Sequence, residues 1–395
     1  MPASPSTARA INDRLALRLL QQEGPLTAGR LKQLTGLSRP TVADLVERLT
    51  AAGLIEPAGE SGEQRRGPNA RLHRIVAERA WLAALDVRTE SVSVLVSDLV
   101  GRVRAEASAP IGDDAGTGPA VEQAVTLVER AAKEAGADRL HAIGIGAPGL
   151  IDPATGELRD STGLPAWHRR LMAGLGERFA GARISVENET NLAALAEQRE
   201  GAARDRETFA LLWLGLGIGA GVVLDGTLRR GVSGGAGEIG FLPVPGTTGL
   251  PSATDCGGGF HSLAGAVAVT ALAAEHGVTA DPAPPEQRAA ALVRRAVDDG
   301  GPSAGRFLDV LADRLAVGVA AVVAVLDPGC VVLAGETGRA GGSALAARVQ
   351  DRLGRLSPLA TEVRTGALGG GAVLRGALLT ARDRAQDELF APAER

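Results

Sequence analysis

Residues 209–226 read FALLWLGLGIGAGVVLDG, and this stretch decides the fold. Residues 209–214 and 220–224 are apolar runs, which is typical of two short buried strands. The glycine-rich segment 215–219 between them predicts a tight loop, and Asp225-Gly226 is a strong hairpin signal. The stretch therefore predicts two neighbouring strands followed by a tight turn.

The first half of the chain repeats this order of elements. Strands are expected at 82–87 and 91–97, and the turn Asp98–Gly101 corresponds to Asp225-Gly226. Two similar α/β halves imply two lobes, and a cleft between lobes is a favoured ligand site. The other elements expected from hydrophobic periodicity are a strand ending near Ala107, helices over 120–135, 168–180 and 190–200, and strands at 141–145, 183–186 and 330–334.

One glycine motif could suggest a different fold. Residues 144–149 read GIGAPG and formally match the GxGxxG fingerprint of dinucleotide-binding proteins. That fingerprint requires a helix to begin within the motif. Here a turn with a second proline follows at Leu150–Pro153 instead. A Rossmann-type dinucleotide site is therefore disfavoured.

Residues 1–80 have the pattern of a separate small domain. A helix is expected over 8–22, with Gly24-Pro25 after it. Thr27 and Ser38 are good N-caps for two further helices, which Gly36 and Gly53 would end. Strands are expected at 54–56 and 71–75. This order predicts a winged helix-turn-helix, a DNA-binding fold, although three short helices also occur in protein-interaction modules.

Several polar residues of this domain are expected to contact DNA. The start of the third helix would face base edges in the major groove, and Arg39 suits a guanine edge. The arginine-rich wing would reach a phosphate or a minor groove. The expected contacts are Thr27, Ser38, Arg39, Thr41, Arg65, Arg66 and Arg71.

Composition is consistent with a nucleic-acid-binding end on a soluble body. Residues 1–80 hold 12 Lys and Arg against 8 Asp and Glu, whereas the rest of the chain holds 30 against 38. Two cysteines, Cys256 and Cys330, do not make a disulfide scaffold and suit a reducing compartment. The longest apolar run has 12 residues, too few to span a bilayer. We therefore expect a cytoplasmic protein without a membrane partner.

Six segments of residues 81–395 together resemble the ROK family. This family joins sugar kinases and sugar-responsive transcriptional repressors in one actin-like, two-lobed fold. ROK repressors carry an N-terminal winged helix that the kinases usually lack, so the chain resembles a repressor of the NagC/XylR type. The segments are GIGAPGLID at 144–152, LPAW at 164–167, VENETNLAALAE at 186–197, LGLGIGAG at 214–221, GGAGEIG at 234–240 and LDPG at 326–329.

The resemblance implies three structural parts, whose names are kept below. The head is the winged helix-turn-helix of residues 1–80. Lobe 1 comprises residues 81–200, with a helix at 372–390 packing back on it, and lobe 2 comprises residues 201–371. The resemblance also implies a homodimer or tetramer, and a symmetric dimer implies a roughly palindromic operator in double-stranded DNA.

Two departures from the family pattern predict the loss of kinase activity. ROK kinases have an Asp-x-Gly-x-Thr phosphate loop, but here residues 86–90 read DVRTE, with Arg88 at the glycine and Glu90 at the hydroxyl position. Arg88 would fill the phosphate space, and Glu90 would repel a triphosphate. The family's general base is an Asp, and this chain has Glu189 there. Phosphoryl transfer depends on positioning and charge, so Glu189 is expected to be inactive and the chain not to be an enzyme.

The zinc loop of the family is also incomplete. Its histidine corresponds to Phe241, and its three cysteines to Thr254, Cys256 and His261. A structural zinc needs four ligands, and Cys256 and His261 supply two. No metal or other cofactor is therefore expected.

By resemblance, sugar hydroxyls would meet Gly149, Thr162, Asn188, Glu189 and Glu238. Two polar family contacts are replaced by Phe241 and Leu263, which makes the site less polar than a typical hexose pocket. Glu187 and Glu197 are expected to be solvated or capping carboxylates. The sequence thus predicts a DNA-binding repressor that senses a carbohydrate-like effector without phosphorylating it. The alternatives are a sugar kinase and a ligand-independent regulator whose body only dimerises.

Overall fold

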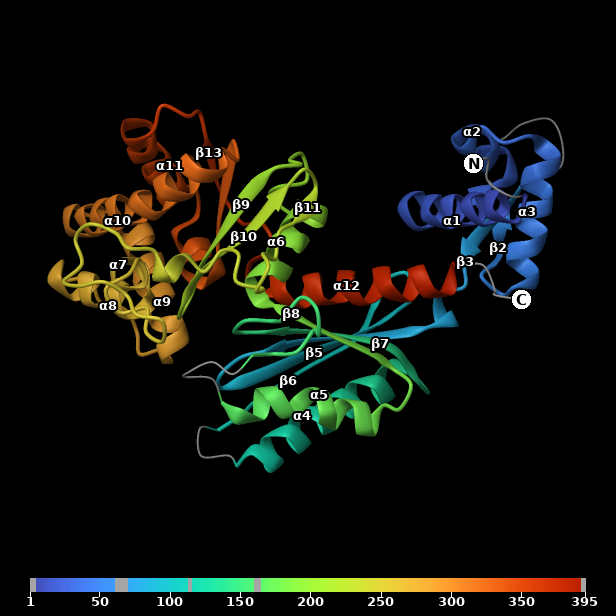
Figure 1. Ribbon diagram of the computed structural model, residues 1–395, viewed down its shortest axis with the longest axis horizontal. Coiled ribbons are helices and arrows are strands. Elements are labelled where there is room, and N and C mark those ends of the chain that lie inside the picture. Colours follow the sequence, from blue (N-terminus) through green and yellow to red (C-terminus); the bar gives the residue numbers. More distant parts are fainter. Residues whose placement is uncertain (1–4, 61–69, 113–115, 160–164, 392–395) are drawn as a thin grey trace.

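The computed structural model describes residues 5–60, 70–112, 116–159 and 165–391 (Figure 1). A small helical head adjoins one end of helix α12 (Ala372–Leu389) in a body of two α/β lobes, and both parts are as the sequence predicts. None of the helices in these ranges combines the length and the apolar composition of a membrane span.

The head is a winged helix-turn-helix whose short helices have the predicted caps. The side chain of Thr27 accepts a hydrogen bond from the backbone of Arg30, and that of Ser38 accepts one from the backbone of Thr41. The three strands pair in the order β1-β3-β2. The elements are α1 (Pro5–Glu23), β1 (Leu26–Thr27), α2 (Ala28–Thr35), α3 (Arg39–Ala51), β2 (Ile55–Glu60) and β3 (Arg71–Ile75).

Lobe 1 is built on a five-stranded sheet in the order β6-β5-β4-β7-β8. Strands β4, β5 and β6 form an antiparallel meander, and β7 and β8 join it in parallel. Helices α4 and α5 cover one face of the sheet (Figure 1). The elements are β4 (Trp81–Val87), β5 (Ser91–Asp98), β6 (Val103–Pro110), α4 (Thr117–Ala135), β7 (Leu140–Ala147), α5 (Ala166–Arg178), β8 (Arg183–Asn188) and α6 (Glu189–Glu200).

Lobe 2 repeats this topology, which confirms the duplication expected from the sequence. Its sheet has the order β11-β10-β9-β12-β13, again an antiparallel meander extended by two parallel strands. The elements are β9 (Phe209–Leu214), β10 (Ile218–Leu224), β11 (Thr227–Leu228), α7 (His261–Ala264), α8 (Ala266–Glu275), α9 (Pro285–Asp299), α10 (Pro302–Leu326), β12 (Cys330–Ala334), α11 (Gly335–Leu356) and β13 (Glu362–Thr365).

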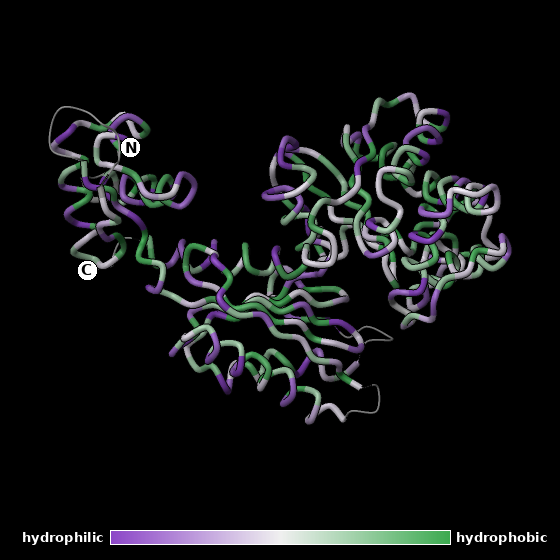
Figure 2. Tube along the Cα trace, turned by 180° about the vertical axis from the view of Figure 1, so that it is seen from behind, coloured by the Kyte–Doolittle hydropathy of each residue, from purple (hydrophilic) through white to green (hydrophobic). Residues whose placement is uncertain are grey.

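Helices α6 and α12 (Ala372–Leu389) lie between the two sheets and join the lobes. Helix α6 packs on β9 and β10, and α12 packs on α6, β4 and β7. Figure 2 shows mainly hydrophobic strands at the centre of lobe 1 and outer helices that alternate between hydrophobic and hydrophilic residues. Buried strands and amphipathic outer helices are what a layered α/β lobe requires.

The GIGAPG glycines have a packing role. A Cβ on Gly144 would lie 2.3 Å from the carbonyl oxygen of Ala377, and a Cβ on Gly146 would lie 2.4 Å from Val373. Both partners belong to α12, so the two glycines let the helix lie directly on β7. No helix begins within the motif, in agreement with the sequence argument against a dinucleotide fingerprint.

The C-terminal end of α12 contacts the head. The Gln386 side chain donates to Gln21 Oε1 of α1 at 3.0 Å and to the backbone oxygen of Leu99 at 3.1 Å. Arg14 of α1 pairs with Asp387 at 2.9 Å. Buried side chains of the head, of α6 and of α12 form one continuous apolar cluster. The head is therefore held by α12 in addition to its covalent connection.

Candidate functional site

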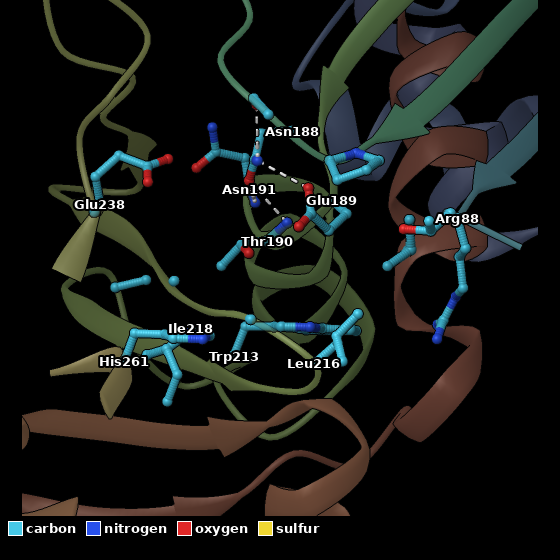
Figure 3. Close-up of a pocket in the computed structure, with 18 of the residues that line it drawn as sticks. Arg88, Asn188, Glu189, Thr190, Asn191, Trp213, Leu216, Ile218, Glu238 and His261 are labelled. Atoms are coloured by element: carbon cyan, nitrogen blue, oxygen red, sulfur yellow. Dashed lines mark hydrogen bonds between the residues drawn. The ribbon is translucent and has the colours of Figure 1, made fainter. Parts of the chain in front are cut away.

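A cavity of about 580 Å³ lies between the lobes (Figure 3). Its lining comes from the β4–β5 turn, the segment after β7, the start of α6, the β9–β10 loop, residues 234–238 and the first turn of α11. Four of the five expected effector residues line it, namely Gly149, Asn188, Glu189 and Glu238. The fifth, Thr162, lies outside the described residues.

Asn188 is the N-cap of α6, and both ends of its amide are already bonded. Its Oδ1 accepts hydrogen bonds from the backbone of Thr190 at 2.9 Å and of Asn191 at 3.3 Å. Its Nδ2 donates to the backbone oxygen of Gly149 at 3.1 Å and to Glu189 Oε2 at 2.8 Å. Asn188 therefore positions two other lining residues and caps a helix, a local role that its place before a helix indicates.

Glu189 begins α6 and points into the cavity beside Asn188 (Figure 3). Burial, together with the nearby carboxylates of Asp86 and Glu238, raises the pKa of Glu189 to about 8. Its carboxyl group is therefore mostly protonated at neutral pH. A protonated carboxyl group donates a hydrogen bond but does not accept a proton as a general base.

Glu238 faces Asn188 and Asn191 across the cavity (Figure 3). Burial raises the pKa of its carboxyl group as well. The segment that carries it is anchored to lobe 1, because Arg230 forms an ion pair with the buried Glu187. The carboxyl groups of Glu189 and Glu238 thus offer polar atoms from both lobes to a bound polyol.

Arg88 occupies the β4–β5 turn and forms ion pairs with residues of both lobes. Its Nε lies 3.1 Å from Asp86 Oδ2 in lobe 1, and its Nη1 lies 2.5 Å from Glu336 Oε1 in lobe 2. Burial opposes the charge, but the carboxylates of Asp86 and Glu336 raise the pKa of Arg88 above its ordinary value. The expected filling of the phosphate turn by Arg88 agrees with this geometry, whereas the pairing with Glu336 could not be read from the sequence.

The apolar part of the cavity lining was missed by the sequence analysis. Trp213, Leu216, Ile218 and His261 lie along one side of the cavity (Figure 3). The regular alternation of Leu216 and Ile218 with glycines was the available signal, since it places large side chains on one side of the loop. A sugar ring could rest its C–H face on such a surface while its hydroxyls meet the carboxyl groups.

One expectation about acidic residues needs correction, and two are narrowed. Glu90 is not among the residues that line the cavity, so its predicted repulsion of a triphosphate lacks a structural basis. Of the solvated and capping alternatives for Glu187 and Glu197, the structure favours capping, since Glu187 is 8% exposed and accepts from the backbone of Asn188, and Glu197 is fully buried. Glu197 accepts hydrogen bonds from the backbone of Ala202, Ala367 and Leu368, at 2.6, 3.1 and 2.9 Å. It therefore joins α6 to the segment that precedes α12.

Two protein-family models match the two parts of this architecture. The model of the ROK family matches residues 83–384, and the model of the MarR family matches residues 11–67. The chain belongs to the ROK family. The match covers the cavity, both lobes and most of α12, and the MarR match covers the helices of the head.

Similar ROK proteins include both regulators and kinases. The xylose repressor of Caldicellulosiruptor bescii is 25% identical over 60% of this chain and 59% of its own length. The regulator NagC of Escherichia coli is 28% identical over 60% of this chain and 58% of its own length. The glucokinase of Thermotoga maritima is 31% identical over 50% of this chain and 65% of its own length. The chain therefore aligns with about three fifths of these relatives.

Solved structures agree on the fold. A crystal structure of a ROK family transcriptional regulator, described as a homologue of the E. coli MLC protein, has a TM-score of 0.76. It is 20% identical, and the match covers 97% of this chain and 98% of that one. A ROK hexokinase from Thermus thermophilus has a TM-score of 0.62 and is 30% identical over 78% of this chain and 99% of its own. The regulator thus matches the head as well as the body.

The zinc loop of the family does not assemble a metal site in the described part of this chain. No group of three His, Cys, Asp or Glu side chains there is arranged to hold a metal ion. His261 lines the cavity instead, and burial lowers its pKa. Zinc-free protein remains a prediction, to be tested by metal analysis.

The residues expected to contact DNA differ in whether their side chains already form hydrogen bonds within the head. Thr27 and Ser38 act as N-caps, and Ser38 Oγ lies 2.8 Å from Thr41 Oγ1, so these hydroxyls serve the local structure first. Arg39, at the start of α3, and Arg71, at the start of β3, are exposed. Arg65 and Arg66 lie outside the described residues.

Proposed function

We propose that this ROK protein is a DNA-binding transcriptional regulator, acting as a repressor, whose cleft binds a sugar-like effector that it does not phosphorylate. One observation carries the proposal. A winged helix-turn-helix with an exposed Arg39 is attached to a kinase-like body in which Arg88, paired on both sides, occupies the phosphate turn. The full-length similarity to a ROK regulator supports the same conclusion.

The head has the chemistry for sequence-specific DNA binding. The start of α3 enters the major groove in this fold, and an exposed arginine there can form two hydrogen bonds to guanine. A homodimer would present two heads to a roughly palindromic operator. Arg71, together with Arg65 and Arg66 outside the described residues, would add contacts to the DNA backbone.

The cavity has the chemistry for a polyol. The carboxyl groups of Glu189 and Glu238 can form hydrogen bonds to sugar hydroxyls from the two lobes. Gly149 adds its backbone carbonyl oxygen, and Trp213 adds an apolar surface. Relatives are named for xylose and N-acetylglucosamine, which favours a carbohydrate effector here. Helix α12 supports coupling to DNA, since Val373 lines the cavity at one end and Gln386 contacts the head at the other.

Kinase activity is the second candidate, favoured by the similarity to glucokinases. One observation counts against it. Arg88 lies in the turn that would approach phosphates, and its guanidinium is already paired with Asp86 and Glu336. A sugar-dependent ATP turnover above about 1 s⁻¹ would favour the kinase.

The proposal is tested by a gel-shift titration of the full chain on the DNA upstream of its own gene, with and without a panel of free sugars. We expect one sugar to change operator affinity about 5–150-fold, which corresponds to coupling of about 1–3 kcal/mol. Glu238→Gln should keep operator binding and lose the sugar response. The matched control is Glu275→Gln on the exposed end of α8, which should keep both.

Asn188 requires a more careful variant than alanine. Asn188→Ala removes the cap of α6, so a lost response would have two explanations. Asn188→Asp keeps the capping oxygen but cannot donate to the Gly149 carbonyl. If no sugar changes melting or DNA binding, the ligand-independent regulator is preferred. If removal of residues 1–80 leaves operator affinity unchanged, the DNA-binding proposal is wrong.

A further inference from the structure

The β4–β5 turn carries a three-residue ion cluster that crosses from one lobe to the other. Asp86 is the buried, second-to-last residue of β4, Arg88 lies in the turn after β4, and Glu336 lies in the first turn of α11. The Arg88 guanidinium contacts Asp86 with Nε and Glu336 with Nη1. We call these three residues the interlobe bridge.

The surroundings of the interlobe bridge favour a stable contact. The side chains of Asp86, Arg88 and Glu336 are 6%, 27% and 19% exposed, so the charges are screened much less than those of a surface pair. A carboxylate in the first turn of a helix also gains from the helix dipole, which stabilises Glu336 at the start of α11. The backbone oxygen of Arg88 lies 3.2 Å from His168 Nε2, and this contact ties the turn to α5.

The position of the interlobe bridge has a consequence for ligand charge. All three residues line the cavity, together with the carboxyl groups of Glu189 and Glu238. Arg88 is the one arginine or lysine among the described lining residues, and two carboxylates already share its charge. A phosphate entering here would meet four acidic side chains and would have to displace one of them from Arg88.

We propose that the interlobe bridge takes the place of a nucleotide, holding the two lobes together at the β4–β5 turn, so that the cleft accepts an uncharged sugar and excludes phosphorylated ligands. The selection among sugars rests on the proposed effector function. The bridge itself does not, since its ion pairs are formed entirely by side chains of the two lobes.

The first test uses inorganic pyrophosphate as an anionic probe on the full-length protein. Wild-type protein should not be stabilised by pyrophosphate in a thermal-shift titration. Glu336→Gln frees half of the Arg88 guanidinium, so this variant should bind pyrophosphate at least about tenfold more tightly, a difference of about 1.4 kcal/mol. The double variant Arg88→Met/Glu336→Gln should lose that gain, because no cation remains in the cavity lining.

The second test follows amide hydrogen exchange without ligand or DNA. Arg88→Met should speed exchange at the start of α11 in lobe 2, and Glu336→Gln should speed exchange at the β4–β5 turn in lobe 1. Arg88→Lys keeps the charge but cannot contact both carboxylates with one planar group, so it should act like Arg88→Met. Arg178→Met is the control, since Arg178 pairs with Glu122 and Glu129 within lobe 1 and should leave α11 unchanged.

Two results would overturn the inference. One is tight pyrophosphate binding by wild-type protein, which would show that Arg88 is available to anions. The other is exchange that changes only in the lobe carrying the substitution, which would show that the pair does not hold the lobes together. Neither result depends on operator binding, so the inference and the proposed function fail separately.

Discussion

Replacing Glu189 by glutamine should change how the stability of the body depends on pH. Burial and the neighbouring carboxylates raise the pKa of Glu189 from an ordinary value of 4.5 to about 8. Between these two values the folded protein holds a proton that the unfolded chain releases. Stability that is present below pH 4.5 is therefore lost as the pH rises toward 8.

The magnitude follows from linkage. One extra proton in the folded state gives a slope of about 1.4 kcal/mol per pH unit, or at most about 3 kcal/mol from pH 5.5 to 7.5. Glu189 is half-buried, so solvent screening reduces this, and we expect about 1.5–3 kcal/mol. Four buried or half-buried histidines change stability in the opposite direction, because desolvation lowers their pKa values. These are His73, His141, His168 and His261.

The assay is urea unfolding at fixed pH values, followed by tryptophan fluorescence. Trp81, Trp167 and Trp213 all belong to the body, so the signal reports on the two lobes and not on the head. The quantity of interest is the difference in unfolding free energy between Glu189→Gln and wild type, since the histidine contributions cancel in it. This difference should grow in favour of the variant as the pH rises. Glu106→Gln, on an exposed position of β6, is the control for removing one carboxylate.

A difference that stays constant from pH 5.5 to 7.5 would refute the reasoning. It would mean that Glu189 is already ionised throughout this pH range. The hydrogen bond from Asn188 does not complicate the comparison, because the glutamine oxygen can accept it in the same position.

Three further predictions concern other parts of the molecule. Arg39→Ala should weaken operator binding by about 1–3 kcal/mol and relax specificity at one base pair, whereas Arg295→Ala on the exposed side of α9 should not; both are measured by gel shift. Metal analysis after dialysis should find no stoichiometric zinc, and one zinc per chain that is lost in Cys256→Ser would show that the loop recruits other ligands. Glu197→Ala should destabilise the body by about 1–3 kcal/mol in urea unfolding, because it removes a fully buried carboxylate that accepts three part-buried backbone hydrogen bonds, and an effect below about 0.5 kcal/mol would contradict this argument.

Local features were the most predictable from the sequence. Thr27 and Ser38 cap helices as expected, since capping depends on residues within one turn. The duplicated sheets were also predictable, because apolar runs and glycine turns are encoded along each strand. The exact ends of strands were less predictable. Strand β2 extends to Glu60, four residues beyond its expected end.

Contacts between distant segments could not be predicted in the same way. Glu336 lies 248 positions from Arg88, and no local pattern links the two. The burial of Glu197 depends on backbone groups near residue 367, so its sequence neighbours gave no indication of it. Four of the residues expected to bind an effector line the cavity, and their binding role stays a prediction. The capping role of Asn188 appears only when its hydrogen bonds are traced.

The packing of α12 also has a consequence for the synthesis of this protein on the ribosome. Lobe 2 interrupts lobe 1 in the chain, so α12 is translated after every other helix and strand of the body. Until it emerges, the face of β7 with Gly144 and Gly146 has no cover, and the nascent head has no Gln386 or Asp387 to contact. Translation of the head begins first, yet its attachment to the body is completed last. A ribosome that stops before α12 would therefore release a finished DNA-binding head that lacks the contacts α12 supplies.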